Sequence, residues 1–146
     1  LPDQPYFKGS WGYIEGKARS TTSEIENTTD GPLYQTWREN LRAYQIDAPS
    51  GTYEVELLMA DVSRSRPQLA NLLGRGDDGQ AIADSRFNIT ICGRRMETDF
   101  SPADGGHYRQ AFRRRYIIQN KENKIDVLFE TLKGKCHLAG IKIRKL

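Results

Sequence analysis

The feature that most constrains the fold is a stretch of alternating apolar and polar residues at 52–62. Its apolar side chains fall at every second position, at Tyr53, Val55, Leu57 and Met59. Glu54 and Glu56 fall between them and face the other way. A period of two residues is typical of a β-strand with one buried face. We therefore expect a core strand here.

Other segments have the pattern or composition of strands. They are Phe87–Cys92, Arg115–Gln119, Lys124–Thr131 and His137–Ile143, with a shorter alternating run at Leu41–Ile46. The polar residues 120–123 predict a hairpin turn between two of these strands. No stretch keeps a helical period beyond a turn or two. The expected fold class is therefore all-β, a jelly-roll β-sandwich.

The remaining segments are expected to be loops. Residues 1–19 combine aromatic side chains with three glycines and two prolines, which break regular structure. Residues 20–29 predict an exposed loop, and residues 97–110 predict another. The longest segment, residues 63–84, is polar, and a short helical turn is expected within it at 68–73. Loops of this length often carry function.

The composition limits the domain count and the partners. A chain of 146 residues is most simply one domain, residues 1–146. Its net charge of +3 is too small to indicate nucleic acid, and no run of about 18 apolar residues predicts a membrane span. Arg113–Arg115 is interpreted as a solvated strand entry, with a phosphate or sulfate contact as the alternative. Because the sequence starts at Leu1 without methionine, we expect the domain to be excised from a larger multidomain protein.

Residues for catalysis or metal binding form no recognisable pattern. Glycoside hydrolysis needs two opposed carboxylates, and no such pair is identifiable from the spacing of the acidic residues. The sequence has no Gly-x-Ser-x-Gly motif, phosphate-binding loop or cluster of histidines. We therefore expect no enzyme activity, no cofactor and no metal. Alternation places Cys92 and Cys136 opposite the apolar faces of their strands, which favours two separate thiols over a disulfide.

The densest group of polar and aromatic residues is Leu33-Tyr34-Gln35-Thr36-Trp37-Arg38. A sugar ring has an apolar face and a rim of hydroxyls, so it is bound by flat aromatic groups and planar hydrogen-bonding groups. Tyr34 and Trp37 can supply the aromatic platforms, and Arg38 and Glu39 can bind hydroxyls. The alternative is structural, with both aromatics wedged under a loop and Arg38 paired with an acid.

This hexapeptide resembles the Leu-Tyr-Gln-Thr-x-Arg signature of malectin-like carbohydrate-binding domains. Gly51–Asp61, Arg86–Gly93 and Leu138–Ile143 resemble further strands of that family. The opening Pro2–Tyr13 is similar to copies of the domain at the C-terminus of bacterial family 2 glycoside hydrolases of the β-galactosidase type. The resemblance implies a non-catalytic domain that binds an oligosaccharide or polysaccharide beside the neighbouring domains of its parent enzyme, in the periplasm or outside the cell.

The candidate carbohydrate-binding residues are Tyr34, Trp37, Arg38, Tyr13 and Trp11. Tyr34 matches a family position at which a tyrosine contacts sugar. The family's prototype has an aromatic pair where this sequence reads Val62-Ser63-Arg64, so its diglucose specificity is not expected. A second loop site at His107 and Tyr108 is a further alternative. The alternative function is a structural or protein-docking β-sandwich without a working sugar site.

Overall fold

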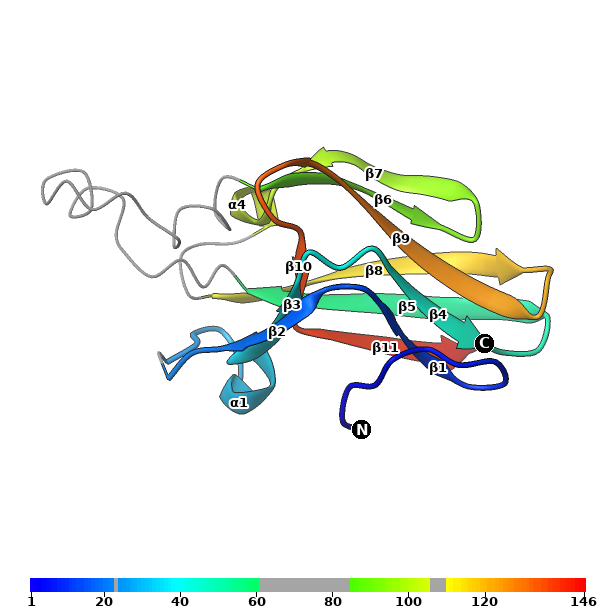
Figure 1. The fold of residues 1–146 in the computed structure, drawn as a ribbon, viewed down its shortest axis with the longest axis horizontal. Helices are drawn as coiled ribbons and strands as arrows, with labels where there is room; N and C mark the ends of the chain where they lie inside the picture. Colours follow the sequence, from blue (N-terminus) through cyan, green and yellow to red (C-terminus); the bar gives the residue numbers. More distant parts are fainter. Residues whose placement is uncertain (23, 61–84, 106–109) are drawn as a thin grey trace, which may run out of the picture.

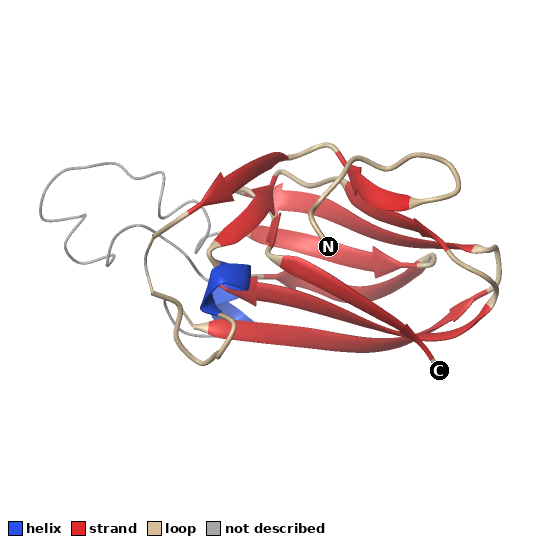
Figure 2. Ribbon diagram, turned by 90° about the horizontal axis from the view of Figure 1, so that it is seen from below, coloured by secondary structure: helices blue, strands red, loops and turns tan. Residues whose placement is uncertain are grey.

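The computed structural model describes residues 1–22, 24–60, 85–105 and 110–146. Strands make up most of this part of the chain and form two main antiparallel sheets that face each other (Figures 1 and 2). The larger sheet has the strand order β1-β4-β9-β6-β7. Its strands are β1 (Trp11–Ile14), β4 (Ala43–Asp47), β6 (Arg86–Ile91), β7 (Arg94–Phe100) and β9 (Lys124–Lys133).

The second main sheet has the order β11-β5-β8. Its strands are β5 (Gly51–Ala60), β8 (Ala111–Asn120) and β11 (Gly140–Lys145). β5 is central, and it pairs with β8 along its whole length and with β11 from Tyr53 to Leu58. The alternating stretch that dominates the sequence is therefore the middle strand of this sheet.

A third, short sheet with the order β10-β3-β2 connects the two layers. Its strands are β2 (Lys17–Ser20), β3 (Thr36–Glu39) and β10 (His137–Leu138). Along the chain, β3 is followed by β4 of the larger sheet, and β10 is followed by β11 of the second. The one-turn helix α1 (Gly31–Tyr34) lies beside β2 and β3, at the end of the sandwich where β5 finishes (Figure 1). A second single turn, α4 (Pro102–Gly105), follows β7.

The core lies between the two main sheets and is built from alternate residues of their strands. β5 contributes Tyr53, Val55, Leu57 and Met59, and the facing strands β6 and β9 contribute Phe87, Ile89, Ile91, Ile125, Val127 and Phe129. Glu54 and Glu56 lie on the opposite, outer face of β5. The expected all-β sandwich is confirmed, because the two-residue period places one face of each strand in a shared apolar layer.

Three local expectations are wrong, because pairing with distant strands overrides local composition. Residues 1–19 contain β1 and β2, which pair with β4 and β3. The segment expected as a loop at 97–110 begins with the end of β7, which continues to Phe100. Cys136 is fully buried in the main core, where its thiol donates to the Leu41 carbonyl at 2.9 Å, and burial raises the pKa of this thiol. As expected, both cysteines are free.

Among the described residues, no helix is long and apolar enough to cross a membrane. Nor do three or more His, Cys, Asp or Glu side chains in this part of the chain come together as a metal site. The helical turn expected at 68–73 lies outside the described residues.

Candidate functional site

Tyr34 ends helix α1 and lies against the outer face of the β11-β5-β8 sheet. Pro32 stands at the start of α1, where the missing backbone N–H costs nothing. The side chain of Tyr34 is only 4% exposed and belongs to a second apolar cluster, with Ile25, Trp37, Leu58, Ala60 and Ala111. The burial of Ile25 also shows that the loop at 20–29 is anchored to the sheet. Tyr34 is therefore mainly a wedge beneath this loop, and little of its ring is left for a ligand.

An open hollow of about 460 Å³, the Tyr34 hollow, is lined by Tyr34 and by residues from three separate segments. The loop before α1 and α1 itself contribute Asn27, Thr28, Thr29, Asp30 and Leu33, whereas β8 contributes Arg113 and β11 contributes Lys142. All of these residues except Leu33 offer hydrogen-bonding side chains. Shallow hollows of this size, with one aromatic group and several polar groups, suit a hydroxyl-rich ligand.

The guanidinium of Arg113 is held in place at the Tyr34 hollow by a buried acid. Its Nη1 donates to Oε1 of Glu56 at 3.0 Å, and Glu56 is 6% exposed. Burial raises the pKa of the Tyr34 hydroxyl, an effect that the positive charge of Arg113 opposes. The direction of this shift means that Tyr34 keeps its proton at neutral pH and can donate a hydrogen bond.

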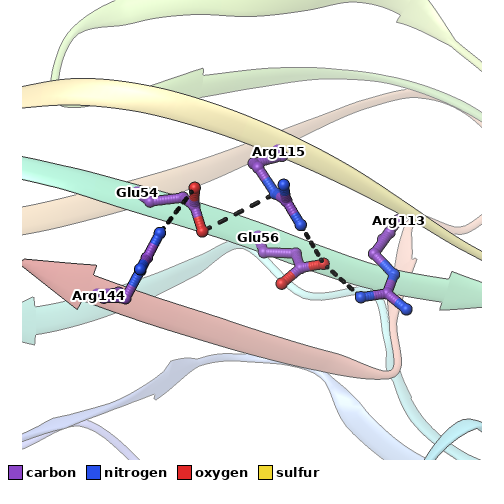
Figure 3. Close-up of polar contacts among 5 residues, drawn as sticks. All are labelled: Glu54, Glu56, Arg113, Arg115 and Arg144. Atoms are coloured by element: carbon purple, nitrogen blue, oxygen red, sulfur yellow. Dashed lines mark hydrogen bonds and ion pairs between the residues drawn. The ribbon is translucent and has the colours of Figure 1, made fainter. Parts of the chain in front are cut away.

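A row of charged side chains on the outer face of the β11-β5-β8 sheet leads to the Tyr34 hollow (Figure 3). Glu56 lies 3.0 Å from Arg113 and 3.7 Å from Arg115. Glu54 lies 3.8 Å from Arg115 and 3.4 Å from Arg144. The basic stretch interpreted as a solvated strand entry is thus part of an ion-pair network whose arginines remain more than half exposed.

Trp37 and Arg38 line a different hollow, of about 430 Å³. Arg38 is already occupied by protein groups: Nε donates to Oδ2 of Asp3 at 2.8 Å, and Nη1 donates to the Gly16 carbonyl at 2.9 Å. Its Cζ lies 3.3 Å from the centroid of the Tyr13 ring, a cation–π contact that covers one face of that ring. The pairing of Arg38 with an acid matches the structural alternative for this residue.

Trp11 lines a third hollow, of about 460 Å³, near the edges of β1 and β11. This hollow is more apolar than the other two, with Leu1, Ile46, Ile141 and Ile143 among its lining residues. The structure therefore distributes the five predicted residues over three places. Tyr34 lines one hollow, Trp37 and Arg38 line a second, Trp11 lines a third, and Tyr13 stacks under Arg38.

Sequence reasoning missed Asn27, Asp30 and Lys142 as partners of Tyr34, and it considered Arg113 as an alternative phosphate or sulfate contact without placing it beside Tyr34. Asn27 and Asp30 lie just before α1, whereas Arg113 and Lys142 come from strands far away in the chain, so no local motif joins these two cations to Tyr34. One signal was present: Glu56 lies on the polar face of an alternating strand, and Arg113 begins the basic stretch 113–115. The alternative loop site at His107 and Tyr108 lies outside the described residues, as do positions 62–64.

Glu39, considered as a ligand for sugar hydroxyls, is 5% exposed. Its Oε1 lies 2.7 Å from Nε of Arg19 and 3.6 Å from Nζ of Lys135. The carboxylate therefore neutralises two cations inside the β10-β3-β2 sheet, and its oxygens are turned away from solvent. This position corrects the expectation from the sequence.

Asp3 also accepts a hydrogen bond from the hydroxyl of Tyr44, which is 7% exposed. Burial, followed by this hydrogen bond, raises the pKa of Tyr44 above its ordinary value of 10.0. The unfolded chain therefore loses this proton first as pH rises, so stability present below about pH 10 is lost at higher pH. We expect Tyr44→Phe to lose less stability than the wild type between about pH 9 and about pH 11, as measured by urea unfolding. Equal losses in both proteins would contradict the role of Tyr44.

Comparison with known proteins identifies a family and similar solved structures. The family model of the malectin domain matches residues 2–143. A crystal structure of a Bacteroides uniformis β-glucuronidase is 42% identical to this chain, with a TM-score of 0.84, over 100% of this chain and 16% of that one. The chain thus spans about one-sixth of that protein's length. No curated protein matches the chain.

Plant receptor structures share the fold at lower identity. The plant receptor-like kinase FER is 14% identical, with a TM-score of 0.68, over 92% of this chain and 34% of that one. The ANXUR1 extracellular domain from Arabidopsis thaliana is 17% identical, with a TM-score of 0.66, over 90% and 39%. These structures and the chain share one all-β sandwich fold. The chain belongs to the malectin domain family.

Proposed function

We propose that this chain is a non-catalytic, carbohydrate-binding accessory domain of a bacterial glycoside hydrolase. The β-galactosidase type implied by the sequence and the β-glucuronidase among the similar structures both cleave β-linked glycosides, and we propose a parent enzyme of that class. The domain comprises residues 1–146 and acts in the periplasm or outside the cell. By binding a glycan, it raises the effective concentration of substrate at the neighbouring catalytic domain.

The observation that carries this proposal is the Tyr34 hollow. Its size fits a sugar unit, and its polar groups are matched to a rim of hydroxyls, with Asn27 and Thr28 at one side and Arg113 at the other. Only a small part of Tyr34 is exposed, so we expect a weak interaction, with Kd between about 1 μM and about 1 mM. Such affinity suits an accessory domain, which acts together with its parent.

Titration of a panel of oligosaccharides tests this proposal. We expect Tyr34→Ala to abolish binding, because it removes the hydroxyl and also the buried ring that supports the loop lining the hollow. Tyr34→Phe keeps the packing of the second apolar cluster and removes one hydrogen bond, so we expect about a two- to tenfold loss of affinity. Nuclear magnetic resonance titration measures both effects and shows at the same time whether each variant is folded.

Trp11→Phe is the control, because Trp11 lines a neighbouring hollow that shares Leu33 and Lys142 with the Tyr34 hollow but does not include Tyr34. We expect this variant to bind like the wild type. If Trp11→Phe weakens binding and Tyr34→Phe does not, the site is in the wrong hollow. If no sugar binds the wild-type chain at millimolar concentration, the proposal fails, and docking against neighbouring domains becomes the better explanation.

A further inference from the structure

The Tyr34 hollow has an unusual charge balance for a site that binds neutral sugars. Two cations line it, Arg113 and Lys142, whereas the lining includes a single carboxylate, Asp30. Neutral hydroxyls are bound as well by amide and hydroxyl groups as by cations, and they do not need a surplus of positive charge. The positive groups therefore raise the question of which ligand atoms they face.

Arg113 is held in position but not fully used by the protein. Its hydrogen bond to Glu56 occupies one of the five N–H groups of the guanidinium, and its side chain is 58% exposed. Because Glu56 is buried and also lies 3.7 Å from Arg115, it fixes the orientation of Arg113 from below. The remaining donors of Arg113 are pre-organised for an oxyanion, the group that a guanidinium binds best.

Lys142 supplies a positive charge that has no ion-pair partner in the described part of the chain. It stands opposite Glu56 in the register of β11 and β5, yet it makes no ion pair among the residues that the structure describes. Glu56 is already paired with Arg113 and Arg115. The ammonium group of Lys142 is exposed and lines the same hollow as Arg113, so an anion in the hollow can contact both.

We propose that the Tyr34 hollow binds an acidic sugar, whose carboxylate or sulfate group lies between Arg113 and Lys142. This inference rests on the proposed function and adds the chemical class of the glycan. Tyr34 and Asn27 contact the neutral part of the sugar, and Asp30 opposes the anionic group from the loop side. A negatively charged ligand is thus favoured over its neutral analogue by two cations and disfavoured by one carboxylate.

The test compares three methyl glycosides that differ at one position: methyl glucoside, its C6 carboxylate and its C6 sulfate ester. We expect the charged glycosides to bind at least tenfold more tightly than the neutral one. Raising the salt concentration from about 0.05 M to about 0.5 M should weaken the charged pair and leave the neutral glycoside unchanged. The preferred anion distinguishes a uronate-containing glycan from a sulfated one.

Four variants assign the effect to residues. Arg113→Gln should weaken binding of the preferred anion about tenfold, and Lys142→Gln about threefold. Arg144→Gln is the matched control for Lys142→Gln, because it also removes one positive charge from β11, two residues further on. Arg144 does not line the hollow, so this variant should change the affinity less than twofold. Asp30→Asn should strengthen binding about twofold, because it removes the opposing charge. Arg115 still pairs with Glu56 in Arg113→Gln, which keeps the sheet face intact.

Each outcome separates this inference from the proposed function. If the neutral glycoside binds as tightly as the charged ones and the variants have no effect, the acidic-sugar inference is overturned while carbohydrate binding stands. If Arg144→Gln weakens binding as much as Lys142→Gln, the anion is attracted by the total positive charge of the sheet face, and the assignment of the site to Arg113 and Lys142 is overturned. If no glycoside or oligosaccharide binds, the proposed function fails together with this inference.

Discussion

Replacing Phe87 by alanine is expected to lower the free energy of unfolding by about 3–5 kcal/mol. Phe87 lies on β6 and is fully buried. Its ring packs edge-to-face against Phe100 at a centroid distance of 5.5 Å and lies 6.2 Å from the ring of Phe129. The substitution removes these contacts and leaves a cavity in the core between the two main sheets. A loss of this size is a large fraction of the roughly 5–15 kcal/mol that stabilises a typical domain.

Urea unfolding, followed by the fluorescence of the two tryptophans, measures this effect. Leu128→Ala is the control, because Leu128 lies on the neighbouring strand β9 but is 43% exposed, and its loss should cost less than about 1 kcal/mol. Similar costs for the two substitutions would show that Phe87 does not sit in the main core. The slope of unfolding against urea concentration should remain the same in both variants.

The second large effect is expected when Glu39 loses both of its cationic partners. Arg19→Ala or Lys135→Ala alone leaves one cation beside the carboxylate, and each should cost about 1 kcal/mol. The double variant leaves a buried carboxylate without either of the cations that pair with it in the described part of the chain. We expect it to cost about 3–5 kcal/mol, more than the two single changes together. The excess over additivity is the energetic coupling of the two cations through Glu39.

Glu39→Gln in the background of the double variant provides the control. The amide has nearly the shape of the carboxylate but no charge, so it should recover most of the lost stability. Urea unfolding is measured for the wild type, the two single variants, the double variant and the triple variant with Glu39→Gln, which completes the mutant cycle. Strictly additive single costs, or an amide that recovers nothing, would show that the carboxylate is better solvated than its 5% exposure indicates.

The fold was predictable from the sequence to a large extent, because strand periodicity is a local property. The alternation in β5, β6 and β9 identifies the buried face of each strand without knowledge of its neighbours. The edge strands were harder to predict. β1 and β2 are only four residues long and lie among glycine-containing turns, and they are strands because β4 and β3 provide their hydrogen-bond partners. Cys136 was misplaced for a related reason, since it follows β9 where local alternation no longer defines a face.

The candidate site was predictable only in its first member. Tyr34 belongs to a local motif, and the structure places it at a polar hollow. Trp37 and Arg38 belong to the same motif, yet they line a different hollow, because the chain leaves helix α1 after Tyr34 and continues as strand β3. Glu39, next in the strand, is drawn into an ion-pair cluster with Arg19 of β2 and Lys135 before β10.

By itself, the sequence determined the fold class, the faces of the central strands and the identity of Tyr34 as the residue to test. The tertiary structure decided which side chains surround Tyr34. The order β11-β5-β8 places Lys142 and Arg113 on either side of β5, where both reach one hollow at the end of the sandwich. The physical reason is that periodicity depends on nearest neighbours in the chain, whereas the composition of a site depends on which strands form hydrogen bonds and in which register.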